Sequence, residues 1–222
     1  MSETLTEAVD LEYAKENMIK QQVRILGVPY GKMLDAMIQI PRELFVPKDM
    51  KALAYSELDI PVNHGRYAFT PKTVTQILQA VALKHSDTVL QVGIGCGYLT
   101  ALMAKLASMI ELYDIHEDMI NHVKHRLKSL AIYNIKYQHA KEIESKAHYD
   151  VIVLRETQLS SPDAYIDQLS PNGRLLYFVD KVDYITAVLV TKKQGATLEK
   201  KCIFDLYTKV NKVAQTPEAF AF

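Results

Sequence analysis

The first third of the chain carries apolar side chains at helical spacing and then loses that spacing. Apolar residues recur every three or four positions from Leu11 to Leu26, which predicts a helix. Gly27 is a typical residue for ending it. A second helix is predicted over Gly31–Ile38. The segment Lys48–Thr70 shows little periodicity, so it is predicted to be a long loop, a kind of segment that often carries function.

From Pro71 onward, short apolar runs alternate with amphipathic helical patterns. This alternation predicts a parallel sheet with helices on both faces. Two later β-rich runs, joined across Gln194-Gly195, predict a terminal antiparallel hairpin. The predicted helices are Pro71–Leu83, Tyr98–Ala107, Glu117–Leu130 and Pro162–Leu169; the predicted parallel strands are Thr88–Val92, Ile110–Asp114, Ile135–His139, Tyr149–Leu154 and, after a Pro171-Asn172-Gly173 turn, Arg174–Val179; the hairpin strands are Ile185–Lys192 and Thr197–Tyr207.

A glycine-rich turn joins the first of these parallel strands to the next helix. Residues 89–100 read Val-Leu-Gln-Val-Gly-Ile-Gly-Cys-Gly-Tyr-Leu-Thr. Because Gly93, Gly95 and Gly97 lack Cβ atoms, the backbone can turn tightly and approach a ligand closely. The helix that follows offers unpaired N–H groups at its start. The pattern predicts a nucleotide-cofactor site; the alternative is a turn that is merely tight.

The spacing of the glycines favours S-adenosylmethionine over a dinucleotide. Dinucleotide sites prefer Gly-x-Gly-x-x-Gly, whereas here the third glycine comes one residue earlier and Tyr98 follows it. S-adenosylmethionine has no phosphate, and its site needs close backbone approach and a carboxylate for the ribose hydroxyls. Asp114 ends the second strand about twenty residues after the turn, as such sites require. The alternative is that Asp114 begins a capping box with Glu117.

Composition is that of an ordinary single domain. The 222 residues include 26 basic and 26 acidic side chains, so the formal net charge is zero and nothing indicates a nucleic-acid surface. The acidic N-terminus is unlike a signal peptide, and no apolar run is long enough to span a membrane. Cys96 and Cys202 form no Cys-x-x-Cys pair, which favours the cytoplasm. Residues 1–70 are predicted to supply helices and a substrate loop, and 71–222 the cofactor-binding core; the oligomeric state is open.

Two histidines on one predicted helix are candidate metal ligands. His122 and His125 lie three residues apart, but no third ligand with suitable spacing accompanies them. Neighbouring basic residues make a solvated basic face the better interpretation. The sequence therefore predicts no metal site.

Several longer blocks resemble the protein-L-isoaspartate O-methyltransferase family over almost the whole chain. The most specific is Ala36–Pro47, which is similar to the family's Ala-Met-x-x-Val-Pro-Arg-Glu-x-Phe-Val-Pro. Residues 89–101 resemble its Val-Leu-Glu-Ile-Gly-x-Gly-x-Gly-Tyr-x-Thr-Ala block. Further similar segments are Ala54–Glu57 with Ile60–Val62, Tyr149–Val153, and Gln168–Leu175.

The resemblance implies a fold, a cofactor and a reaction. The fold would be a Rossmann-like methyltransferase fold: a central, mostly parallel sheet with a terminal antiparallel hairpin and an N-terminal helical extension. The reaction would transfer a methyl group from S-adenosylmethionine to the free carboxylate of an isoaspartyl residue in a damaged protein, as a step of protein repair. Such a carboxylate is already ionised at neutral pH, so catalysis would come mainly from alignment and exclusion of water.

The substrate loop departs from the family pattern. The family's Gly-Gln-Thr-Ile-Ser-x-Pro aligns with Gly65–Pro71, which places Phe69 where the family has a serine near the reacting carboxylate. Phenylalanine cannot hydrogen-bond a carboxylate, so Thr70 or Arg66 is predicted to orient it. A guanidinium binds carboxylates bidentately, and the alternative for Arg66 is a solvated loop arginine.

Two positions that the resemblance places near the cofactor also depart from the family pattern. Gln91 replaces the family's acidic residue in the glycine block, which keeps hydrogen bonding and loses the charge. Ala140-Lys141-Glu142 replaces Gly-Asp-Gly, so either Glu142 takes the place of the aspartate near the adenine amine or the adenine is bound more weakly. These departures leave two alternatives to isoaspartyl methylation: a catalytically degenerate binding protein of the same fold, or a methyltransferase with another acceptor. The predicted cofactor-binding residues are Gly93, Gly95, Gly97, Asp114, Gln91 and Glu142.

Overall fold

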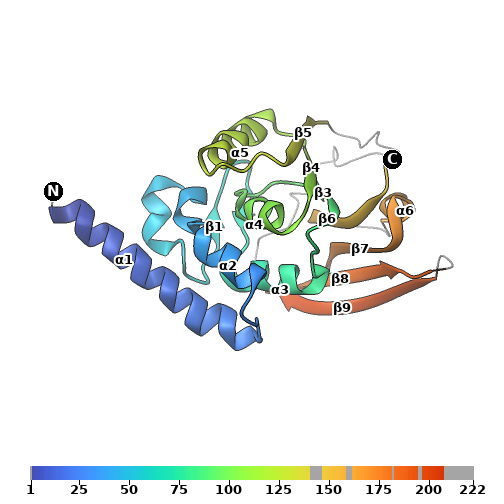
Figure 1. Cartoon of the computed structure of the whole chain (residues 1–222), viewed down its shortest axis with the longest axis horizontal. Coiled ribbons are helices and arrows are strands. Elements are labelled where there is room, and N and C mark those ends of the chain that lie inside the picture. The colour runs from blue at the N-terminus through green and yellow to red at the C-terminus, as the bar shows by residue number, and fades with distance from the viewer. Residues whose placement is uncertain (1, 141–146, 159–161, 182, 195–196, 208–222) are drawn as a thin grey trace.

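The computed structural model describes residues 2–140, 147–158, 162–181, 183–194 and 197–207. Its centre is a seven-stranded sheet with the order β5-β4-β3-β6-β7-β8-β9 (Figure 1). Strands β3 to β7 are parallel where they pair, while β8 runs antiparallel to both β7 and β9. The strands are β3 (Thr88–Val92), β4 (Met109–Asp114), β5 (Ile135–His139), β6 (Tyr149–Gln158), β7 (Leu169–Asp180), β8 (Ile185–Lys192) and β9 (Leu198–Leu206). The predicted mostly parallel sheet with a terminal hairpin is confirmed.

The central strands are buried on both faces, whereas β9 is mostly exposed, and the two faces of the sheet are covered unequally. Alternate residues of a strand point to opposite faces, so in β3 Val89 joins the larger apolar cluster and Leu90 the smaller one. The larger cluster takes in apolar side chains from α2 to α5, and the smaller one packs against Tyr165 and Ile166 of α6. The helices are α2 (Lys32–Gln39), α3 (Pro71–Val81), α4 (Tyr98–Leu106), α5 (Glu117–Ser129) and α6 (Asp163–Asp167).

The N-terminal helix is longer than predicted. Helix α1 (Ser2–Met18) begins nine residues before Leu11 and continues through a π-helical turn, Ile19–Val23, and a 3₁₀ turn, Arg24–Leu26. Its end is where the sequence places it, because Gly27 takes the left-handed conformation with φ 79°. Apolar residues at positions 5, 8 and 9 continue the helical spacing upstream of Leu11, and the predicted start did not include them. No helix among the described residues is long and apolar enough to cross a bilayer.

The segment predicted as a long loop contains regular structure. Two 3₁₀ turns, Arg42–Phe45 and Lys48–Leu53, precede a small hairpin of β1 (Ile60–Pro61) and β2 (Tyr67–Ala68). The buried Arg42 guanidinium holds this segment against the core: its Nε donates to the Ala54 carbonyl and its Nη2 to the Phe69 carbonyl, each at 2.6 Å. The segment is therefore anchored at both ends.

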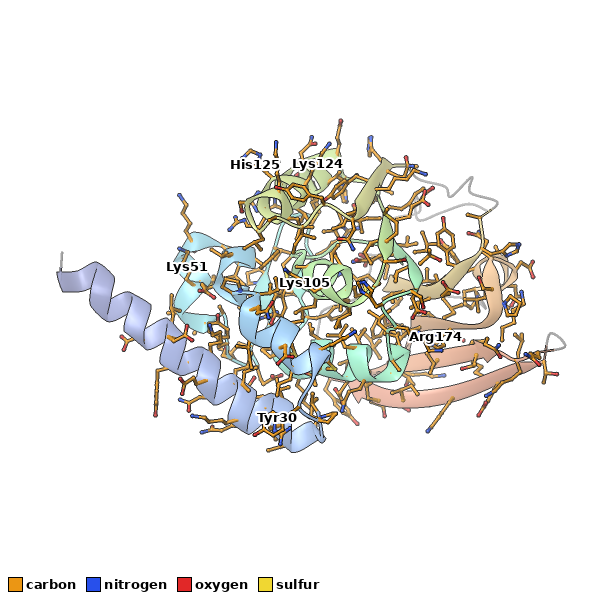
Figure 2. The ribbon with its side chains drawn as sticks, viewed as in Figure 1. Tyr30, Lys51, Lys105, Lys124, His125 and Arg174 are labelled. Carbon is orange, nitrogen blue, oxygen red and sulfur yellow. The ribbon has the colours of Figure 1, made fainter. Side chains whose placement is uncertain are left out.

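Two strands of the sheet extend beyond their predicted bounds. Strand β7 includes residues 171–173, which were predicted to form a separate turn; the ladder with β6 shifts register there, and Asn172 has φ 62°. Arg174, labelled in Figure 2, donates from Nε to the Val81 carbonyl and from Nη2 to Asp87, each at 2.6 Å, and so joins β7 to the end of α3. Strand β6 continues to Gln158, which places Arg155 and Glu156 at the carboxyl edge of the sheet.

Candidate functional site

The glycine turn has the backbone that its sequence predicts. Gly93, Gly95 and Gly97 have φ values of 86°, 63° and 90°, a region that other residues seldom adopt. Gly97 is also the N-cap of α4, and a Cβ there would lie 2.8 Å from the Val123 side chain of α5. The glycines are thus required both for the turn and for the close approach of α5.

Gln91 stabilises the glycine turn through its side-chain amide. Its side chain is buried; Nε2 donates to the Gly93 carbonyl at 2.9 Å, and Oε1 accepts from the Thr100 hydroxyl of α4 at 2.8 Å. Strand, turn and helix are joined through one amide. Both polar atoms of the side chain already have partners, one in the turn and one on α4. The predicted contact between Gln91 and the cofactor stays a prediction.

Asp114 presents a fully buried carboxylate beside the turn, at the end of β4. Its Oδ2 accepts from the Ile94 N–H at 2.8 Å, and its Oδ1 from the His116 N–H at 2.9 Å. The capping-box alternative is wrong, since the N-cap of α5 is His116. The carboxylate instead connects the end of β4 to the glycine turn.

Arg66 also contacts Asp114, at the oxygen that accepts from Ile94. Its Nη1 lies 2.7 Å from Asp114 Oδ2, and its Nε lies 2.9 Å from Glu156 Oε1. The Arg66 side chain is 12% exposed, so the alternative of a solvated loop arginine is wrong. One guanidinium therefore bridges two carboxylates at the ends of β4 and β6.

Arg155 belongs to the same cluster and was not predicted. Its Nη1 lies 3.2 Å from Glu156 Oε1, and its Nη2 donates to the Tyr67 carbonyl. A Cβ on Gly95 would lie 2.4 Å from Arg155 Nε, so this side chain packs directly on the turn. Burial lowers the pKa of the Arg155 guanidinium and the Glu156 carboxylate opposes that shift. The signal available in the sequence was an Arg-Glu pair that directly continues a buried strand.

Phe69 and Thr70, in the substrate-loop motif that departs from the family pattern, both have structural roles. Phe69 is buried, with its ring centroid 5.4 Å from that of Phe178 and the Arg155 guanidinium 4.9 Å from its ring. Thr70 is the N-cap of α3, and its hydroxyl accepts from the Thr73 N–H at 3.2 Å. The structure thus brings Arg66 to Asp114 while Thr70 caps a helix. Glu142 lies outside the described residues.

The cluster stands at the carboxyl ends of β3, β4 and β6, where open α/β sheets bind their ligands. The positive-φ turn and the buried Asp114 carboxylate fit an adenosyl cofactor, whose ribose hydroxyls need an acceptor. Arg66 holds one oxygen of that acceptor, and Arg155 covers Gly95. The residues therefore fit the cofactor once the Arg66 guanidinium leaves Asp114 and the Arg155 guanidinium leaves Gly95.

Comparison with known proteins identifies the family. The model of the protein-L-isoaspartate(D-aspartate) O-methyltransferase family matches residues 13–213. Relatives with the name protein-L-isoaspartate O-methyltransferase include one from Methanoculleus marisnigri, 29% identical over 82% of this chain and 84% of the relative, and one from Aliivibrio fischeri, 31% identical over 73% and 80%.

A solved structure agrees with these sequence matches. A protein-L-isoaspartate O-methyltransferase of Plasmodium falciparum, crystallised with S-adenosyl-L-homocysteine, superimposes with a TM-score of 0.74 at 21% identity, covering 91% of this chain and 99% of that one. The methyltransferase fold is confirmed, as are the enzyme class and the S-adenosylmethionine cofactor that the family uses. The chain belongs to the protein-L-isoaspartate(D-aspartate) O-methyltransferase family.

Proposed function

We propose that this chain methylates the free carboxylate of isoaspartyl residues in damaged proteins, as a step of protein repair in the cytoplasm. The observation that carries the proposal is the buried Asp114 carboxylate beside a glycine turn with three positive φ angles. The family match over residues 13–213 supports the acceptor. The unpaired Cys96 and Cys202 support a reducing compartment.

The chain's own residues are proposed to hold the two reactants by an exchange of partners. Asp114 would accept hydrogen bonds from the ribose hydroxyls, and Arg66 would leave Asp114 Oδ2 for them. The released guanidinium would then bind the acceptor carboxylate, a partner of the same charge and shape as the one it leaves. Glu156, 2.9 Å from Arg66 Nε, would keep the side chain near the edge of the sheet.

Little acid or base chemistry is required at this site. S-adenosylmethionine supplies, when bound, a methyl group on a positively charged sulfur. The acceptor carboxylate is ionised at neutral pH, so no residue needs to remove a proton from it. The work of the protein is therefore alignment and exclusion of water, to which the buried Phe69 contributes by packing against the core beside the site.

A second candidate function, binding without catalysis, is favoured by one observation. Arg66 and Arg155 lie against the groups that the cofactor would contact, in an arrangement where every carboxylate of the cluster is paired. A protein of this fold that has lost the cofactor would be stabilised by such ion pairs. Calorimetry with S-adenosylmethionine separates this candidate from an active enzyme.

The test combines calorimetry with transfer of labelled methyl to an isoaspartyl peptide. The wild-type chain should bind the cofactor and label the peptide, and Asp114→Asn should lose both. Arg66→Ala should bind the cofactor about tenfold more tightly, the equivalent of one competing charge-assisted hydrogen bond, and label the peptide less. Arg126→Ala on α5 removes an arginine elsewhere and should behave as wild type.

Each negative result of this experiment contradicts a different part of the proposal. No cofactor binding by either wild type or Arg66→Ala would contradict the proposal and support the non-catalytic candidate. Cofactor binding without labelling of the peptide would support a methyltransferase with another acceptor. Equal cofactor affinity in wild type and Arg66→Ala would contradict the exchange of partners alone.

A further inference from the structure

Two histidines and an aspartate that are distant in the sequence meet beside the candidate site. His64 lies between β1 and β2, while His116 and Asp118 begin α5. One ligand-type atom of each, an imidazole nitrogen or a carboxylate oxygen, lies within 4.8 Å of the others. The sequence predicted no metal site, because only the fold brings His64 to the other two.

The hairpin turn places His64 in this position. The β1–β2 hairpin closes over His64-Gly65, both with positive φ, 60° and 68°, and Arg66 N–H donates to the Asn63 carbonyl at 3.4 Å. These are the features of a type I′ turn, whose central positions usually hold asparagine, aspartate or glycine. Among other residue types, histidine is one of those enriched at positive φ. Here its side chain extends away from the hairpin and reaches α5.

The side chains meet closely. His64 Nε2 lies 2.9 and 3.0 Å from the two Asp118 carboxylate oxygens. The His64 and His116 rings are stacked, with centroids 3.7 Å apart and planes 4° apart. Burial, followed by the charges of Arg66 and His64, lowers the pKa of His116.

We infer that His64, His116 and Asp118 form a binding site for a divalent transition-metal ion such as Zn²⁺. Two imidazoles and one carboxylate are a ligand set that zinc accepts in sites with three protein ligands and one exchangeable position. Imidazole ligands favour zinc and its neighbours over Mg²⁺ or Ca²⁺, which take oxygen ligands. On binding, the hydrogen bond between His64 Nε2 and Asp118 would give way to a bond from each residue to the metal ion.

The adjustment that binding requires is confined to side chains. Zinc bonds of about 2.0–2.1 Å in tetrahedral geometry place ligand atoms about 3.3 Å apart, so the atoms must approach by at most about 1.5 Å. The parallel rings must also rotate, because lone pairs lie in the ring planes. His64 and Asp118 are 35% and 58% exposed in their side chains, which leaves room for both movements.

The local charges permit a cation here. The positive charge of Arg66 acts on His116, but it is shared between Asp114 and Glu156. Asp118 adds a further negative charge at the site itself. A bound ion would join the hairpin that carries Arg66 to the start of α5, and so connect the substrate loop with the segment that follows Asp114.

The test titrates the full-length chain with Zn²⁺ by calorimetry and with Co²⁺ by visible absorption, in the absence of S-adenosylmethionine. The wild type should bind one ion per chain. His64→Asn, which suits a type I′ turn, and His116→Ala should each weaken binding by at least about tenfold. His125→Ala is the matched control, since His125 lies on the outer side of α5, as Figure 2 shows, and outside the cluster.

Each outcome bears on the inference. All variants retain Cys96 and Cys202, so binding by thiols would leave the affinities equal. Zn²⁺ affinity that is the same in wild type and in folded His64→Asn would overturn the inference, as would an equal loss in His125→Ala. Circular dichroism identifies variants that fold, and Asp118→Asn, at an exposed position, replaces any that does not. Because no cofactor is present, the result is independent of the proposed methyl transfer.

Discussion

The glycine turn and the loop of residues 63–70 both contact the Asp114 carboxylate, but different forces hold them in place. The turn reaches Asp114 through the Ile94 backbone N–H, and its path is set by three positive-φ glycines. The loop reaches it through the Arg66 guanidinium. One half of the candidate site is built from backbone geometry and the other from charged side chains.

This difference predicts different sensitivities. A half built from backbone geometry should be disturbed by added volume and be little affected by charge. A half built from buried ion pairs should be disturbed by loss of one partner, because the remaining charge is left buried and unpaired. Because the loop is held by ion pairs, its Arg66 can exchange one carboxylate partner for another. A site that binds two reactants in turn requires such an exchange.

The largest expected effect is on the ion pair that joins the two halves. Asp114→Ala leaves Arg66 Nη1 and two backbone N–H groups without their acceptor, while Arg66 Nε keeps Glu156, and should lower the free energy of unfolding by about 3–5 kcal/mol. Urea unfolding measures this loss. Adding Arg66→Ala removes the guanidinium that has lost this partner, so the double variant should lose less than the two single variants combined. Additive losses would contradict a direct coupling of the two halves.

A smaller effect is expected from volume added to the turn. Gly95→Ala should cost about 2–3 kcal/mol, because φ 63° strains any other residue and the new Cβ would meet Arg155 Nε at 2.4 Å. Gly65→Ala is the matched control: its φ is 68°, and a Cβ there would have no atom within 4 Å. It should cost about 1–2 kcal/mol. Equal thermal shifts for both would show that Arg155 does not pack rigidly on the turn.

The backbone half of the site was predictable from the sequence, and the side-chain half was not. Strands β3 and β5 lie where apolar runs placed them, and the Gly93–Gly97 turn and Asp114 follow from local spacing. The bridge from Arg66 to Asp114 and Glu156 joins residues up to ninety positions apart, and no local pattern specifies such a pairing.

Two local signals were also overridden by tertiary structure. Pro171-Asn172-Gly173 is a strong turn sequence, yet pairing with β6 absorbs it into β7 as an irregularity. His64-Gly65 forms a hairpin turn although histidine is less usual than asparagine, aspartate or glycine at its first central position. The segment 48–70 contains Gly65 but no Asn-Gly or Asp-Gly pair, which is the pair that would have predicted its hairpin.

The smallest expected effect concerns Thr70, which stands where the loop meets α3 and has two proposed roles. If its hydroxyl acts as the helix N-cap, Thr70→Val should lower the free energy of unfolding by about 1 kcal/mol and Thr70→Ser should keep it, since serine also caps. We expect the KM for an isoaspartyl peptide to be the same in wild type and both variants, because the hydroxyl is buried against Thr73. A KM that rises in folded Thr70→Val but not in Thr70→Ser would instead assign the hydroxyl to the acceptor carboxylate. That result would extend the substrate contacts of the loop beyond Arg66, and the loop would then hold its ligand by neutral as well as charged groups.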